Sequence, residues 1–112
     1  MANNISFTNE YPEGKKSYFQ SEIKCTKEEL ESMLGYSMTE SNEVDEDWRF
    51  EGSAYMENVA RIPLIIHNCR KYYPNEEPLF VWQIYTEYFD EGLQLKNYFN
   101  KILHPEDFRH NN

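Results

Sequence analysis

Two residue types that can bind a metal ion or attack a substrate stand two positions apart, at His67 and Cys69. Residues at this spacing in a β-strand point to the same face, so an imidazole and a thiol would lie side by side. A closed zinc site needs a full tetrahedron of such ligands, and no further histidine or cysteine stands at a recognisable spacing from the pair. Nucleophilic catalysis needs a base and a group that orients it, and no activating motif surrounds either residue. We therefore expect no metal, no cofactor and no catalytic residue here. The pair is interpreted as a core cysteine beside a surface or interface histidine.

Carboxylates are concentrated between residues 40 and 51, where the chain reads ESNEVDEDWRFE. Asp45 and Asp47 alternate as the first ligands of a calcium-binding loop do, but the central glycine and the distant glutamate of that loop are missing. Paired carboxylates also act as general acid and base, yet such pairs arise by chance in a chain with 20 acidic residues. The 4 glycines are scattered singly and form no phosphate-binding loop. The sequence therefore predicts that the protein is not an enzyme.

Two interpretations of this acidic stretch remain: a solvated loop that aids solubility, or a surface that docks a basic protein. The formal net charge of -9 repels phosphate backbones and anionic membranes and attracts basic partners. Carboxylates spaced along a strand and a loop can imitate a row of phosphates, so the predicted partner is a basic, nucleic-acid-binding nuclease or effector complex. Tyrosines exposed beside such carboxylates would serve as hot spots. The predicted partner-binding residues are Glu40, Glu43, Asp45, Glu46, Asp47, Glu51, Tyr72 and Tyr73. The carboxylates among them are called the acidic ridge below.

A single domain is expected over residues 1–112. Nine tyrosines, seven phenylalanines and two tryptophans supply much buried area per residue. Residues 1–16 and 105–112 are polar and are expected to form arms. Cys25 and Cys69 are interpreted as reduced thiols, with a disulfide between them left open. No apolar run follows a basic start or is long enough to cross a bilayer, which predicts a cytoplasmic protein, in the host cell if it is viral.

The first predicted strand is SYFQSEIKC, residues 17–25, in which polar and apolar side chains alternate. The face predicted to point inward carries Phe19, Ser21, Ile23 and Cys25. A helix follows, because Thr26 and Glu29 have the spacing of a capping box. Gly35 stands where a helix commonly ends in a left-handed residue. The polar residues 36–46 predict a loop.

Three more strands are predicted from alternating or continuous apolar runs. They cover residues 47–52, 62–69 and 79–88. Trp48 and Phe50 are expected to point inward from the first of these strands, which Gly52 ends or bends. Pro63 lacks an N–H group, so either the second strand lies at a sheet edge or Pro63 lies at its start. The third strand is apolar on both faces, which favours a central position.

Asp90 is predicted to cap a final helix that Pro105 ends. Glu87, Asp90 and Glu91 form a second acidic patch there, which capping and the helix dipole explain as well as docking does. The element order β-α-β-β-β-α predicts an α+β domain, a four-stranded, mainly antiparallel sheet with two helices on one face. An edge strand containing Pro63 leaves homodimer formation open.

The helix "TKEEL", the Trp-x-Phe strand, the apolar strand ending in Arg70-Lys71 and the strand "VWQI" together resemble small hypothetical proteins encoded by phages. The resemblance covers about residues 17–103, although the third strand of those proteins often ends in an aromatic-rich stretch where this chain has HNCRK. In size and acidity the chain is also similar to phage inhibitors of host defence, which include anti-CRISPR proteins and DNA mimics. The resemblance implies a non-enzymatic inhibitor of a host defence protein such as a CRISPR effector. An immunity or antitoxin protein and a small enzyme or ligand-binding protein are the alternatives.

Overall fold

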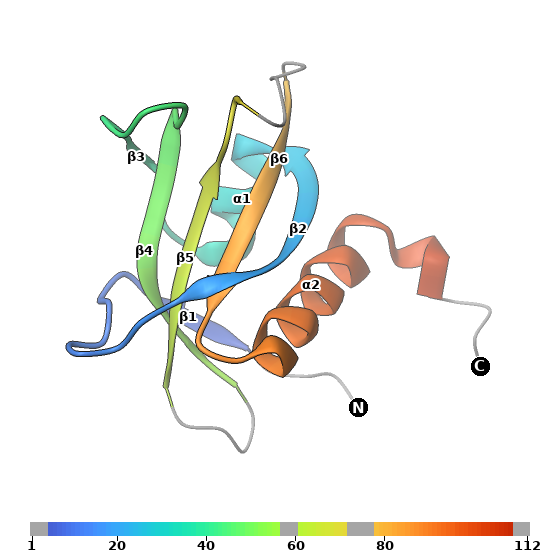
Figure 1. Ribbon diagram of the computed structural model, residues 1–112. Coiled ribbons are helices and arrows are strands. Elements are labelled where there is room, and N and C mark those ends of the chain that lie inside the picture. The colour runs from blue at the N-terminus through green and yellow to red at the C-terminus, as the bar shows by residue number, and fades with distance from the viewer. Residues whose placement is uncertain (1–4, 57–60, 72–77, 109–112) are drawn as a thin grey trace.

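The computed structural model describes residues 5–56, 61–71 and 78–108. Within these residues the chain has an α+β fold, in which helices pack on an antiparallel sheet of six strands (Figure 1). The elements in chain order are β1 (Ser6–Thr8), β2 (Tyr18–Thr26), α1 (Lys27–Leu34), β3 (Thr39–Glu40), β4 (Trp48–Tyr55), β5 (Ile62–Asn68), β6 (Leu79–Thr86), α2 (Phe89–Leu103) and a 3-10 turn, η1 (Pro105–Phe108). No helix in the described ranges is both long enough and apolar enough to span a membrane.

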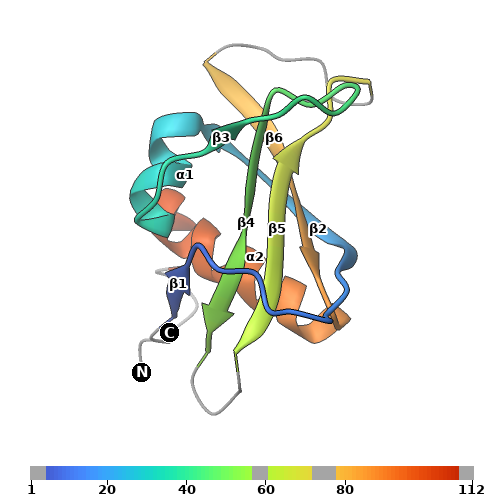
Figure 2. The ribbon, with the colours of Figure 1, turned by 90° about the vertical axis from the view of Figure 1, so that its left-hand side faces the viewer.

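The strand order is β1-β4-β5-β6-β2, and β3 pairs with a separate part of the β4 edge with which β1 also pairs (Figure 2). The prediction of a four-stranded sheet is therefore wrong in the number of strands, although the four predicted strands are present as β2, β4, β5 and β6. The two extra strands lie in the predicted N-terminal arm and in the predicted loop 36–46. They are only three and two residues long. Strands this short are too brief to show an alternating pattern in the sequence. They form because their backbones pair with β4.

Helix α1 begins and ends as predicted. The Thr26 hydroxyl accepts a hydrogen bond from the Glu29 N–H group at 3.0 Å, and the Glu29 carboxylate accepts one from the Thr26 N–H group at 2.9 Å. These reciprocal bonds satisfy N–H groups that the first helical turn leaves unpaired. Gly35 has the left-handed conformation, with φ 83°, and donates its N–H group to the Glu31 carbonyl.

Helix α2 ends at Leu103 before Pro105, as predicted, but it does not begin at an Asp90 cap. Its N-cap residue is Tyr88, and the Glu91 carboxylate accepts the Tyr88 N–H group at 3.1 Å. Glu91 therefore performs the capping that the sequence assigned to Asp90. Of the second acidic patch, Glu91 caps the helix and Glu87 lies 3.8 Å from the Lys15 ammonium group. Both contacts support capping and charge pairing in this patch.

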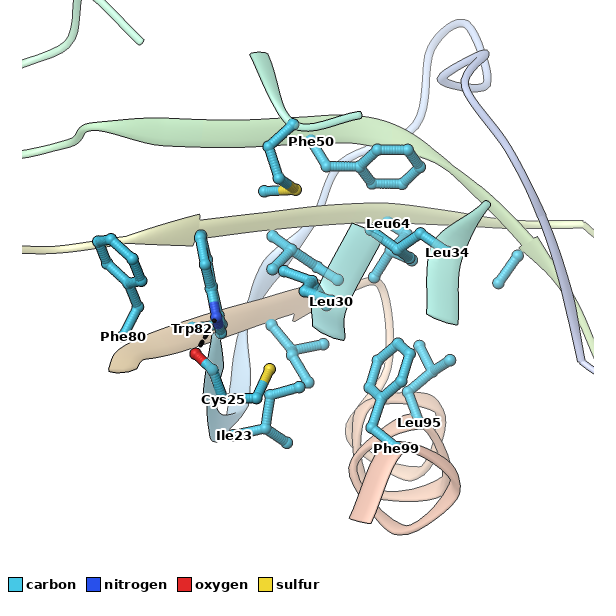
Figure 3. Packing of buried hydrophobic residues seen from close by; sticks show 14 of the residues in the cluster. Ile23, Cys25, Leu30, Leu34, Phe50, Leu64, Phe80, Trp82, Leu95 and Phe99 are labelled. Carbon is cyan, nitrogen blue, oxygen red and sulfur yellow. Dashed lines mark hydrogen bonds between the residues drawn. The ribbon is translucent and has the colours of Figure 1, made fainter. Parts of the chain in front are cut away.

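One hydrophobic core joins both helices to the sheet (Figure 3). Leu30 of α1 and Leu95 and Phe99 of α2 are fully buried in the same cluster as Trp82 of β6. The Trp82 indole N–H group donates a hydrogen bond to the Cys25 carbonyl at 3.1 Å, which ties the centre of the core to β2. The strand predicted over residues 79–88 is thus central, since β6 lies between β5 and β2.

A β-bulge changes the face on which Phe19 lies. The register of β2 against β6 shifts between Phe19 and Ser21, which places one extra residue in β2. Ile23 and Cys25 point into the core as expected, whereas Phe19 is 49% exposed and packs edge-on against Tyr85, with ring centroids 5.9 Å apart. The prediction that Phe19 shares the inward face is therefore wrong, because a bulge reverses the alternation on one side of it.

Pro63 lies near the start of a central strand. Strand β5 pairs with β4 on one side and with β6 on the other, so its prediction as an edge strand is wrong. Pairing with β6 extends from Ile65 to Asn68. Pro63 precedes that segment, and the alternative that it lies at the strand start is confirmed.

Gly52 does not end the predicted strand, since β4 continues to Tyr55. A Cβ atom at this position would overlap the Thr8 carbonyl oxygen of β1 and would lie 2.7 Å from Cζ of Phe50. Glycine is required here because the β1 backbone and the Phe50 ring occupy the space of a side chain.

Candidate functional site

The acidic ridge lies at one end of the sheet, where β3 turns into β4. Glu40 is in β3, Glu51 is in β4, and the other carboxylates of the ridge are in the connection or directly before β4. Asp45 adopts a positive φ of 64° in this turn. Aspartate tolerates the left-handed region better than most residues, and its carbonyl accepts the Arg70 N–H group at 2.7 Å. The structure thus brings the predicted carboxylates together on β3, on β4 and on the connection between them.

Asn68, at the end of β5, holds the ridge in place. Its Oδ1 atom accepts hydrogen bonds from the N–H groups of Asp47 at 3.0 Å and Trp48 at 2.9 Å. Its Nδ2 atom donates to the Asp47 carboxylate at 3.0 Å. The side chain is only 1% exposed, so it acts as a buried connector between β5 and the start of β4. The sequence analysis missed this residue, yet a polar side chain in register with the buried Leu64 and Ile66 was a signal for it.

Arg49 is the cation at the centre of the ridge. Its guanidinium donates to both Glu46 oxygens at 3.1 and 3.0 Å and to the Glu51 carboxylate at 2.6 Å. Burial alone would lower the pKa of Arg49, but the hydrogen bonds to Glu51 and Glu46 and their charges outweigh burial and raise it. Glu46 also accepts the Ser41 hydroxyl at 2.9 Å. The Glu46 carboxylate is therefore a structural partner within the ridge.

The predicted contact residues divide into three groups. Glu46 and Asp47 are engaged internally, since Asp47 also lies 3.3 Å from the Arg70 guanidinium. Glu40 and Glu43 are exposed and form no ion pair with any residue in the described ranges, and Glu51 is exposed beside Arg49. Asp45 is half-buried. Tyr72 and Tyr73 lie outside the described residues.

His67 is buried, which corrects its interpretation as a surface or interface residue. It is 8% exposed, its ring stacks on Tyr85 with centroids 4.8 Å apart, and its Nδ1 atom lies 3.5 Å from the Glu46 carboxylate. The loop that carries the ridge and the Tyr85 ring cover it. Cys69 is half-buried, where a core position was expected. Among the described residues, no group of three or more histidines, cysteines and carboxylates is placed to hold a metal ion.

Cys25 and Cys69 are both free thiols, as interpreted from the sequence. Cys25 is 1% exposed in the core. Burial, with a smaller contribution from the Glu29 charge, raises the pKa of the Cys25 thiol to about 12 against the lowering effect of its contact with Trp82. The buried thiol therefore stays protonated where an exposed one ionises.

We expect this thiol to make the protein less stable at alkaline pH. Below about pH 9 both the folded and the unfolded chain keep the proton, and the stability is fully present. Between about pH 9 and pH 12 only the unfolded chain loses the proton, so the free energy of unfolding should fall by about 1.4 kcal/mol per pH unit. Urea unfolding of the protein and of a Cys25→Ala variant over this range measures the difference. If the free energy of unfolding changes equally with pH in the two proteins, the expectation is wrong.

The motifs that resemble phage-encoded proteins lie in core elements of the structure. The Trp-x-Phe pair starts β4, where Phe50 is buried, and "VWQI" lies in β6, where Trp82 is fully buried. Both motifs therefore report on packing. Comparisons with protein-family models, with curated proteins and with solved structures found no match for this chain.

Proposed function

We propose that this protein is a non-enzymatic inhibitor, phage-encoded, that docks its acidic ridge onto a basic, nucleic-acid-binding host defence protein such as a CRISPR effector. It would act in the host cytoplasm by occupying the surface on which the partner binds nucleic acid. No bond is made or broken in this mechanism. The ridge carboxylates stand in for phosphates, and direct contact with nucleic acid plays no part.

The observation that supports the proposal best is the set of hydrogen bonds that attaches the ridge to the sheet. Residues 40–51 contain six acidic residues and one basic residue, so this short segment carries much of the net charge. Asn68 and Arg49 fix its backbone and its inner carboxylates, while Glu40, Glu43 and Glu51 face solvent. Charges that are held before binding lose less conformational entropy on binding than charges on a mobile loop. A freely solvated loop would not need a buried asparagine to position it.

Charge reversal at the two exposed ridge positions outside ion pairs should weaken partner binding. The test variant is Glu40→Lys with Glu43→Lys, and its matched control is Glu106→Lys with Asp107→Lys, in η1 and far from the ridge (Figure 1). Both variants change the net charge equally. We expect at least about 10-fold weaker binding for the ridge variant, with a shallower salt dependence, and little change for the control.

The measurement starts with immobilised wild-type protein and a bacterial lysate, followed by mass spectrometry of what is retained. The retained protein is then purified, and its Kd for each variant is measured over a salt series, together with displacement of a labelled DNA duplex from it. The proposal is wrong if the partner binds the ridge variant and the control variant with equal affinity. It is also wrong if this protein does not displace the labelled DNA from the partner. Retention of a toxin would instead favour the antitoxin alternative.

A further inference from the structure

The edge of β4 that faces away from β5 is interrupted beside the acidic ridge. Strand β3 pairs with this edge at Trp48 and Arg49, and β1 pairs with it from Ser53 to Tyr55. Glu51 lies between these two segments, and no strand in the described part of the chain pairs with it on this side. The sheet therefore has a gap at the level of Glu51.

The peptide groups of Glu51 point into this gap. The Asp47 carbonyl accepts the Ser41 N–H group at 3.0 Å on the β3 side, whereas the Trp48 N–H group is donated to Asn68 of β5. Peptide groups alternate in direction along a strand, and Glu51 follows Trp48 by an odd number of residues, so its peptide groups are directed away from β5. The pairing of Ser53 with Pro63 is consistent with this direction. Pro63 has no N–H group to donate to the Ser53 carbonyl, and the peptide groups of Ser53 have the same direction as those of Glu51.

A hollow of about 480 Å³ occupies the gap. Its volume lies in the range of ordinary ligand sites. Besides Asn9 and Arg49, its lining residues are Tyr36, Ser37, Thr39, Glu40, Phe50 and Glu51. Neither His67 nor Cys69 lines it. The hollow is thus lined by two glutamates, of which Glu51 also accepts the Arg49 Nε–H group, by three residues with hydroxyl groups, and by two aromatic rings whose centroids lie 6.2 Å apart.

We propose that this hollow receives an arginine side chain presented by the basic partner, an inference that rests on the proposed docking function. A guanidinium group is a planar fork of N–H donors and matches a site built mainly of acceptors. Its flat, weakly hydrated faces also stack on aromatic rings, whereas a lysine ammonium is a compact and strongly hydrated point charge. Arg49 also lines the hollow, but its charge is offset by Glu46 and Glu51. A main-chain carbonyl of the partner would accept the Glu51 N–H group.

The test compares labelled hexa-arginine and hexa-lysine peptides, which have equal charge, by fluorescence anisotropy at about 0.15 M salt. We expect the arginine peptide to bind about 10-fold more tightly than the lysine peptide, which corresponds to about 1.4 kcal/mol. Ser37→Trp should fill the hollow without altering the charge and should bring the two Kd values within about 2-fold. Glu51→Gln should also reduce the preference, while Glu106→Gln, with the same change of charge, should leave it intact. Melting curves establish that each variant is folded.

The outcomes separate the hollow from the ridge. Equal binding of both peptides, lost in the Glu40→Lys and Glu43→Lys variant, would overturn the arginine site and support the docking proposal. An arginine preference that survives both Ser37→Trp and Glu51→Gln would also overturn the site. If both peptides bind the Glu40→Lys and Glu43→Lys variant as tightly as the wild-type protein, both proposals are wrong.

Discussion

Replacement of Gly52 by alanine should destabilise the protein by about 3 kcal/mol, an unusually large effect for the addition of one methyl group. The new Cβ atom would overlap the Thr8 carbonyl oxygen and would lie 2.7 Å from Phe50 Cζ. Neither neighbour can move freely, since Thr8 is paired to β4 and the Phe50 ring is 4% exposed in the core. The strain is relieved only if β1 separates from the sheet or Phe50 is displaced.

Thermal unfolding measures this effect, and a loss of about 3 kcal/mol should lower the Tm by more than about 10 °C. Gly14→Ala is the matched control. Gly14 has a positive φ of 78° but open space around it, so alanine there should cost about 1 kcal/mol through backbone strain alone. A Gly52→Ala protein that melts at or above the temperature of Gly14→Ala would show that β1 does not lie over Gly52.

Replacement of Asn68 by leucine should have the second large effect, on stability and on docking together. Leucine fits a buried position but removes the acceptor of the Asp47 and Trp48 N–H groups and the donor to the Asp47 carboxylate. Leaving such groups without partners costs about 1–3 kcal/mol each where they are shielded from water, and we expect a total of about 3 kcal/mol. The ridge should also lose its fixed position and bind basic peptides more weakly.

Urea unfolding and amide hydrogen exchange at Asp47 and Trp48 measure these effects. Exchange at the two amides should become faster in Asn68→Leu even under conditions where the protein stays folded. Asn97→Leu makes the same chemical change at an exposed position of α2 and should alter the stability by less than about 0.5 kcal/mol. Unchanged exchange at Asp47 and Trp48 would rule out Asn68 as the connector that holds the ridge.

Part of the candidate site could be predicted from residue types alone, and part could not. The gathering of carboxylates in residues 40–51 follows from their closeness in the chain, so the sequence located the ridge. Its division into exposed and internally paired carboxylates depends on Arg70 and on Asn68, both distant in the chain. The hollow at Glu51 depends on the places where β1 and β3 stop, which no local pattern records.

The sequence by itself determined the elements whose signals are local. The reciprocal bonds of Thr26 and Glu29 need only a short spacing, and the apolar runs of β5 and β6 indicate burial on whichever sheet forms around them. The tertiary structure decided the rest: that β1 and β3 are strands, that Phe19 faces away from Ile23, and that His67 is buried. Each of these features depends on a neighbour that is far away in the chain. Such a neighbour leaves no trace in residue spacing, because pairing and packing are chosen among segments that meet only after folding.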